Sequence, residues 1–254
     1  PGTAIASRVG AGIVATIGLV AIQDGLARAS LTGVVEAALG FAPLIIAGKI
    51  LVPKGALLMA RGLPATIMMR GIIAAAFFSA EVFVPLALVE TRGVSYTIAG
   101  LTIAVSAVFW AAGSLVQSRL SGDVDRAPIV RLGALIVSGC LFSMPLVVLT
   151  DLPVWIASIS WAAGAFGMGL AMPSVSVQTM RLSPASDQGV NSAALQIVDS
   201  VLVVAVTALL GLFYAAAVAG QGATPTTYAL LWVISAAMAV LGVIVAPRMR
   251  PPTA

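Results

Sequence analysis

Two carboxylic acids stand in the middle of long apolar stretches of this sequence, at Glu81 and Asp199. If those stretches cross a bilayer, a charge at the centre costs at least about 2.5 kcal/mol on insertion scales, so each acid needs a partner or a function. A low-dielectric site favours the neutral form of a carboxyl group, so such a group is suited to take up and release a proton. The alternative for both residues is structural, namely a hydrogen bond to a neighbouring helix.

Other polar residues fall on the same helical faces as these two acids. Ser192, Gln196 and Asp199 are spaced at i, i+4 and i+7, which places them on one stripe of a helix facing a cavity or another helix. Arg70 precedes Glu81 by almost three helical turns, so the two share a face roughly 16 Å apart along the axis. They are too distant to pair directly, and we expect both to line one water-filled path.

Prolines and glycines near these residues mark candidate hinges. The ring of Pro85 clashes with the carbonyl of Glu81 and leaves that carbonyl without its usual donor, which predicts a kink beside the acid. A later apolar stretch carries Gly167 and Gly169, followed by Pro173. Small residues let membrane helices approach closely, and a bend during transport is the alternative use of these three positions.

The composition excludes several other kinds of chemistry. The chain has no His and one Cys, Cys140, so it offers no Ser-His nucleophile, no Cys/His zinc site and no intrachain disulfide. No Gly-x-x-x-x-Gly-Lys-Ser/Thr run is present, which excludes ATP hydrolysis by a P-loop. We therefore predict no catalytic residues, no metal and no cofactor, and expect that the protein is not an enzyme.

The elements that position these residues are predicted to be membrane-spanning helices. Of the 254 residues, 60% are hydrophobic and only 9% are charged, against roughly 25% charged in soluble domains. The apolar stretches have the length of about 20 residues that a helical span needs, and they lack the alternation of a transmembrane barrel. The sequence thus predicts an all-α integral membrane protein with about eight spans, over residues 5–22, 31–51, 65–89, 96–118, 128–149, 154–180, 187–218 and 227–246.

The basic residues predict the orientation of these spans. In an eight-span arrangement, Arg28 and Arg92 fall on one side and the other eleven of the 13 Lys and Arg residues fall on the opposite side. Cytoplasmic loops are enriched in Lys and Arg, so both ends are predicted to be cytoplasmic in a multi-pass protein of the inner (plasma) membrane. The net charge of +4 is then explained by topology, and no nucleic-acid partner is expected.

A long junction divides the chain into two predicted units. Residues 51–64 contain two Pro, two Gly and two cations, which is typical of a loop. We therefore predict two transmembrane helices and a cytoplasmic loop in residues 1–64, and a six-helix block in residues 65–254.

Several short runs resemble the major facilitator superfamily. The run from Gly113 to Arg131 is similar to the cytoplasmic loop signature of that family, with Asp123 or Asp125 in the place of the signature's acid. The runs that look like actinobacterial multidrug-type members of the family are residues 63–70, 76–78 with Glu81, 85–86, 167–173, 181–184 and 189–196. Two helices before a six-helix block resemble the fourteen-helix drug:proton antiporter branch, in which two linker helices separate the halves.

The resemblance implies two six-helix bundles around a central site that opens alternately to each side. Residues 65–254 would form the C-terminal bundle, and an N-terminal six-helix half is expected outside this sequence. The expected function is proton-coupled efflux of small amphipathic compounds, with Glu81 as the first and Asp199 as the second candidate for protonation. The expected partners are the lipid bilayer, protons and a small-molecule substrate.

In the same scheme, 65–89 and 154–180 line the cavity, 187–218 lies at the interface between the halves, and 128–149 and 227–246 face lipid. Two other classes of function stay open from the residues themselves. One is a non-transporting membrane assembly or scaffold protein, and the other is an intramembrane enzyme.

Overall fold

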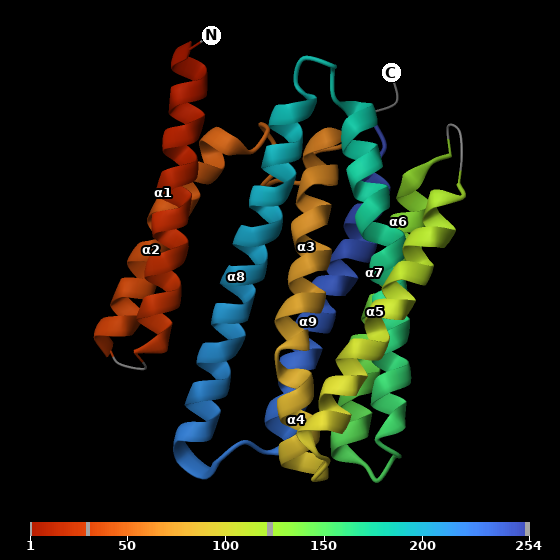
Figure 1. The fold of residues 1–254 in the computed structure, drawn as a ribbon. Coiled ribbons are helices and arrows are strands. Elements are labelled where there is room, and N and C mark those ends of the chain that lie inside the picture. Colours follow the sequence, from red (N-terminus) through yellow and green to blue (C-terminus); the bar gives the residue numbers. More distant parts are fainter. Residues whose placement is uncertain (1, 29–30, 121–123, 252–254) are drawn as a thin grey trace.

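The computed structural model of the chain describes residues 2–28, 31–120 and 124–251, and all regular structure in these ranges is helical (Figure 1). In chain order, the elements are α1 (Gly2–Ala27), α2 (Leu31–Leu51), α3 (Leu63–Glu81), α4 (Phe83–Arg92), α5 (Tyr96–Ser118), α6 (Arg126–Leu149), α7 (Trp155–Leu182), α8 (Gln188–Gln221), α9 (Pro225–Val245) and the 3-10 helix η1 (Ala246–Met249).

Six segments among the described residues are long and apolar enough to cross a membrane. They are α3 together with α4, then α5, α6, α7, α8 to Ala219, and α9 together with η1. Helices α1 and α2 also form where two earlier spans were predicted, with α1 longer than expected at both ends. The prediction of an all-α membrane fold with a C-terminal six-helix block is confirmed.

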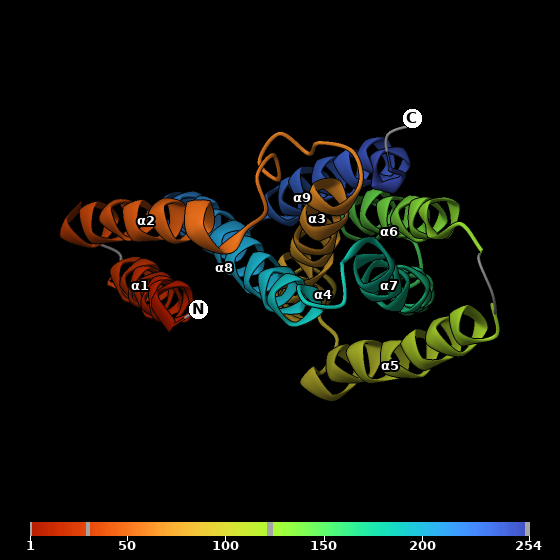
Figure 2. The same cartoon turned by 90° about the horizontal axis from the view of Figure 1, so that it is seen from above.

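The helices run up and down in turn, so that α1 begins and η1 ends at the same end of the molecule (Figure 1). Helices α3 and α7 lie centrally, α6 and α9 cover one side of them, and α8 and α5 flank them on the other (Figure 2). The α1–α2 hairpin stands beside the block and contacts it through α8 (Figures 1 and 2).

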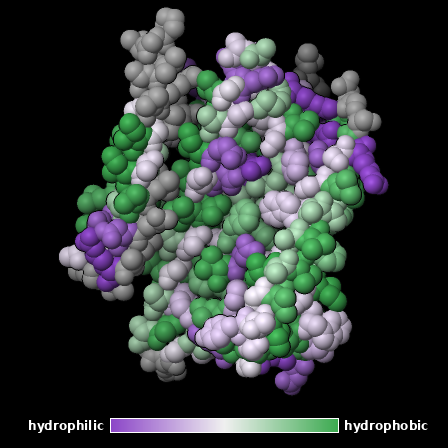
Figure 3. Space-filling view, in the orientation of Figure 1, coloured by the Kyte–Doolittle hydropathy of each residue, from purple (hydrophilic) through white to green (hydrophobic). Residues whose placement is uncertain are grey.

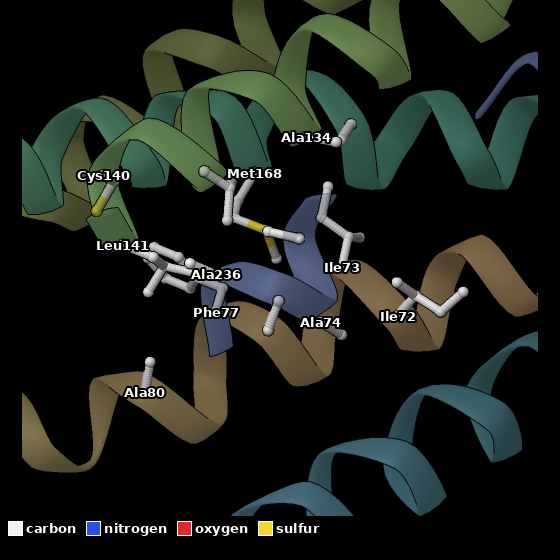
Figure 4. Packing of buried hydrophobic residues seen from close by; sticks show 14 of the residues in the cluster. Ile72, Ile73, Ala74, Phe77, Ala80, Ala134, Cys140, Leu141, Met168 and Ala236 are labelled. Carbon is white, nitrogen blue, oxygen red and sulfur yellow. The ribbon is translucent and has the colours of Figure 1, made fainter. Parts of the chain in front are cut away.

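The tightest packing lies where α3, α6, α7 and α9 meet (Figure 4). Ile73 and Phe77 of α3 contact a cluster that contains Leu141 of α6, Met168 of α7 and Ala236 of α9, all of them buried. Since lipid tails are as apolar as Leu, contacts of this kind hold helices together by close packing and not by removal from water.

Helices α6 and α9, which cover the stretches 128–149 and 227–246 expected to face lipid, each bury part of their surface against other helices. In α9, Tyr228, Trp232 and Ser235 are buried, whereas Val233 and Ile244 are exposed. The surfaces of α5 and α8 are in fact the most open of the six spans. An apolar side chain suits a helix contact and a lipid contact equally, so polarity alone does not distinguish the two environments.

The predicted helix 65–89 is two helices, because the chain breaks at Val82 between α3 and α4. This interruption lies directly after Glu81, which is the place where Pro85 predicts a kink. Pro85 has no N–H for the carbonyl of Glu81, so the hydrogen-bond ladder is already interrupted at that turn.

The two basic residues that fall at the opposite end from the rest both have local hydrogen-bond acceptors. Arg92 closes the C-terminal end of α6, where it donates to the carbonyl oxygens of Val147, of Thr150 at 2.5 Å and of Leu152 at 2.8 Å. Arg28 pairs with Asp24 at 2.5 Å and with Glu36 at 3.1 Å. A cation at a helix C-terminus complements the unpaired carbonyls there, so Arg92 has a structural use on its side of the protein.

Candidate functional site

Glu81 is the last residue of α3 and borders an open cavity of about 260 Å³ between α3 and α5. Its carboxyl group is half-buried, and the other walls are almost entirely apolar. The lining residues besides Glu81 are Phe77, Phe78, Ile103, Ser106, Ala107 and Trp110. A carboxylate in such surroundings has few groups that replace water.

Aromatic rings form the frame of this cavity. Phe77 stacks on Trp161 with ring centroids 4.7 Å apart, and Phe78 stacks on Trp110 at 5.8 Å. The buried Trp161 donates its indole N–H to Oε1 of Glu81 at 3.4 Å. That distance exceeds the usual 2.7–3.2 Å, so this bond holds the carboxylate only weakly.

The helix break next to Glu81 is stabilised from α9. The carbonyl oxygen of Ala80 accepts the indole N–H of Trp232 at 3.4 Å and also the backbone N–H of Val82. Pro85 leaves the carbonyl of Glu81, one residue beyond the carbonyl that Trp232 binds, without its helical donor. The acid thus lies at the joint between α3 and α4.

A second polar cluster joins α3, α7 and α8 nearer the other end of α3. Nε of Arg70 lies 2.8 Å from Oδ2 of Asp199, and both side chains are only 16% exposed. Nη1 of Arg70 also donates to the carbonyl of Met172 at 3.2 Å and to the hydroxyl of Ser176 at 3.3 Å. The guanidinium group therefore ties three spans together, and the charge of Asp199 is already balanced.

A glycine sets the distance between α3 and α8 at this pair. A Cβ atom on Gly71 would lie 2.7 Å from the carbonyl oxygen of Val198 and 2.7 Å from Leu202, so only a residue without a side chain fits there. Arg70 precedes Gly71 and Asp199 follows Val198. The close approach of α3 and α8 at Gly71 therefore brings the side chains of Arg70 and Asp199 within hydrogen-bonding distance.

The three residues of the predicted polar stripe on α8, Ser192, Gln196 and Asp199, each lie in a different environment. Asp199 points to Arg70, and the hydroxyl of Ser192 donates to the carbonyl of Gln188 and lies 4.0 Å from Sδ of Met180. Gln196, between them, is exposed.

On the face of the molecule that Figure 3 shows, hydrophilic residues gather at both ends, and smaller hydrophilic patches interrupt the apolar surface between them.

We expected Arg70 and Glu81 to line one path because they share a helical face. In the structure, the two side chains face different neighbours. Arg70 reaches toward α8 and α7, whereas Glu81 borders a cavity against α5. The face of a helix can be predicted from spacing, but the neighbour that covers each turn depends on long-range packing.

The glycines of α7 lie at its closest contacts with two neighbours. A Cβ on Gly169 would lie 2.2 Å from the carbonyl oxygen of Trp110 in α5, and one on Gly167 would lie 2.7 Å from that of Gly133 in α6. Helix α7 continues unbroken through Pro173, and the carbonyl of Gly169, which Pro173 leaves without its helical donor, accepts the hydroxyl of Ser114 at 3.3 Å. Their use as hinges stays a prediction.

The loop that resembles the family signature has structural uses in the described residues. Asp125 caps the start of α6 by accepting the N–H of Ala127 at 3.0 Å, and it pairs with Arg250 near the C-terminus at 2.7 Å. Asp123, the other candidate for the signature's acid, lies outside the described residues.

Reasoning from the sequence missed the aromatic partners of Glu81, of the Ala80 carbonyl and of Glu90. Tyr228 donates its hydroxyl to Glu90 at 2.5 Å and lies 3.2 Å from the hydroxyl of Tyr214, so α4 is linked to α9 and α8. A Trp or Tyr inside a predicted span is the one sequence signal for a hydrogen bond of this kind, since buried indole and phenol groups usually find a polar partner.

Within the parts of the chain that the structure describes, no group of three or more His, Cys, Asp or Glu side chains is placed to hold a metal ion. The candidate site therefore consists of the carboxyl of Glu81 in its aromatic cavity and the Arg70–Asp199 pair.

Comparison with known proteins gives one match and one negative result. The family model described as Major Facilitator Superfamily matches residues 9–207, which is most of the chain. The match extends from α1 into α8 and so includes both Glu81 and Asp199. No match was found among curated proteins.

Proposed function

The chain belongs to the Major Facilitator Superfamily, a family of membrane transporters, and on that premise we propose that it exports small amphipathic compounds in exchange for protons. The observation that carries the proposal is the position of Glu81 at the α3–α4 joint, beside an aromatic cavity and with one weak hydrogen bond. The actinobacterial multidrug branch, to which the sequence runs are similar, is part of the same proposal.

In the proposed cycle, protonation of Glu81 removes a charge that the apolar walls do not stabilise. An amphipathic substrate lodges its apolar part against Phe77, Phe78 and Trp110, and its polar part competes with the proton for the carboxylate. Binding of a proton and binding of a substrate then exclude each other, which is the requirement for exchange.

The proposed conformational change takes place at Val82, the joint between α3 and α4. The angle between α3 and α4 differs between the outward and inward states, with Pro85 keeping the joint free of a continuous ladder. Gly167, Gly169 and Pro173 in α7 allow the neighbouring helices to slide against it. The Arg70–Asp199 pair holds α3 to α8 in the state described here and is the second candidate for proton coupling.

The proposed setting is the inner (plasma) membrane with both ends of the sequence in the cytoplasm. The cation distribution supports this orientation, because the exceptions Arg28 and Arg92 have local acceptors. We further propose that another six-helix half covers the open sides of α5 and α8, because both helices expose large apolar side chains.

Transport by the full-length protein in inside-out membrane vesicles tests the proposal. We expect an acidic interior to drive accumulation of ethidium, a fluorescent amphipathic cation, and Glu81→Gln to abolish the gradient-dependent part. Glu36→Gln is the matched control, since Glu36 pairs with Arg28 and borders no aromatic cavity. Gradient-dependent accumulation by Glu81→Gln at the rate of the unsubstituted protein would refute the role of Glu81.

A further inference from the structure

An apolar groove separates the α1–α2 hairpin from the six-helix block, away from the cavity at Glu81. It has a volume of about 210 Å³ and is partly open to its surroundings. Four helices and the loop that follows α2 supply its walls, and no charged side chain is among them. Its lining includes Gly48 of α2, Met68 of α3, and Val201, Leu202 and Ala205 of α8.

The groove is long enough to take part of a lipid chain. Its lining on α8 extends from Ile197 to Ala205, which is about 12 Å along the helix axis. The hydrocarbon of one leaflet is roughly 15 Å deep, so the groove spans most of that depth. A straight apolar chain that runs parallel to the helices fits this shape, whereas a bulky polar solute has no hydrogen-bond partner there.

A second hollow of about 270 Å³ adjoins the groove at one end and carries a positive charge. The two share Gly48, Val52 and Leu57, and the second is otherwise lined by the loop that contains Lys54. The Lys54 side chain is exposed, so its ammonium group is available to a headgroup phosphate.

The loop itself is built like a membrane-surface anchor. Leu57 and Leu58 are 70% and 81% exposed, although their neighbour Ala56 is buried and Met59 packs against the core. Backbone bonds from Met59 to Ala56 and from Ala60 to Gly55 keep this arrangement. Exposed leucines beside a lysine are typical of a segment that lies at the boundary between headgroups and acyl chains.

We propose that this groove binds one anionic phospholipid, with an acyl chain between α2 and α8 and the phosphate at Lys54. The apolar walls select a chain, the single cation selects a negative headgroup, and the partly open side lets the lipid enter from the bilayer. The occupant thus fills the space between the hairpin and the block, and the site is distinct from the proposed transport cavity.

The test uses the full chain in phosphatidylcholine vesicles that contain a trace of phosphatidylglycerol with a photoreactive diazirine in one acyl chain. We expect adducts on residues 48–68 and 197–205, mapped by mass spectrometry of the peptides. Unlabelled phosphatidylglycerol is expected to compete about fivefold better than phosphatidylcholine, because one basic residue near an anionic surface contributes about that factor.

Two variants separate the groove from the headgroup contact. Gly48→Leu places a side chain where no atom lies within 4 Å of its Cβ, so it fills the groove without a backbone clash, and adducts should fall at least fivefold. Gly139→Leu, equally open but on α6, is its control and should leave the yield unchanged. Lys54→Gln should remove the preference for phosphatidylglycerol, whereas Arg131→Gln, exposed on α6, should keep it.

Two results would overturn the proposal, and neither depends on transport activity. An equal adduct yield in Gly48→Leu and Gly139→Leu would mean that the lipid does not occupy the groove. Equal competition by phosphatidylglycerol and phosphatidylcholine against the unsubstituted protein would mean that the site does not select an anionic headgroup.

Discussion

At the scale of single residues, the two intramembrane acids have different surroundings and therefore different capacities. Asp199 has a cation at 2.8 Å and shares it with acceptors from α7, so its charge is balanced within the fold. Glu81 has one indole N–H at 3.4 Å and a cavity beside it. A carboxyl group with one weak hydrogen bond and an open cavity beside it is the better proton carrier. Glu81 is therefore the first candidate for proton coupling.

The Arg70–Asp199 pair is expected to stabilise the fold. Asp199→Asn leaves a buried guanidinium group without its counter-ion and should lower the free energy of unfolding by about 3 kcal/mol, whereas the double change Arg70→Met with Asp199→Leu should recover most of it. Thermal unfolding in detergent measures both. A double variant as unstable as Asp199→Asn would show that the pair does not act as a unit.

At the scale of helices, the contacts of α4 explain how a short outer segment is held after the break at Val82. Arg92 binds the C-terminal carbonyls of α6, and Glu90 accepts from Tyr228 of α9. These contacts lie at the far end of α4 from the joint, so they control the angle between α4 and α3.

Removal of the Arg92 contacts should free the end of α6 and the outer end of α4 together. Arg92→Ala leaves three carbonyl oxygens without this donor, and hydrogen exchange of the peptide 144–152 should accelerate at least tenfold. Arg92→Lys, which keeps the charge but not the forked donors, should have an intermediate effect. Unchanged exchange in Arg92→Ala would contradict the capping role.

The glycine contacts of α7 allow a second test at this scale. Gly169→Leu forces a side chain against the backbone of α5, because its Cβ would already lie 2.2 Å from the carbonyl oxygen of Trp110. We expect loss of the folded protein on size-exclusion chromatography. Gly100→Leu on α5, where no atom lies within 4 Å of the added Cβ, is the control and should fold normally.

At the scale of the whole molecule, the up-and-down order of the helices predicts a side for each loop. Impermeant maleimide should label Leu58→Cys only from the cytoplasm and Ser95→Cys only from outside, because their loops lie at opposite ends of the spans. The native Cys140 is buried and gives little background. Labelling of both variants from one side would refute the orientation.

Much of the fold could be predicted from the sequence, because span length and composition depend only on the thickness of the bilayer. The interruption at Val82 lies where Pro85 predicts a kink, but the Trp232 indole that binds the carbonyl of Ala80 comes from 152 residues further along and could not be predicted. The partner of Arg70 was missed for the same reason. Which helix covers a given turn depends on small-residue contacts such as Gly71 with Val198, and one sequence does not show them.

The most direct test of the account is proton release on substrate binding by the purified full-length protein. In weakly buffered detergent solution near neutral pH, addition of ethidium should release protons from the unsubstituted protein and from Glu36→Gln, and none from Glu81→Gln. Proton release of the same size from Glu81→Gln would contradict the central claim, because the proton that a substrate displaces would then come from another group.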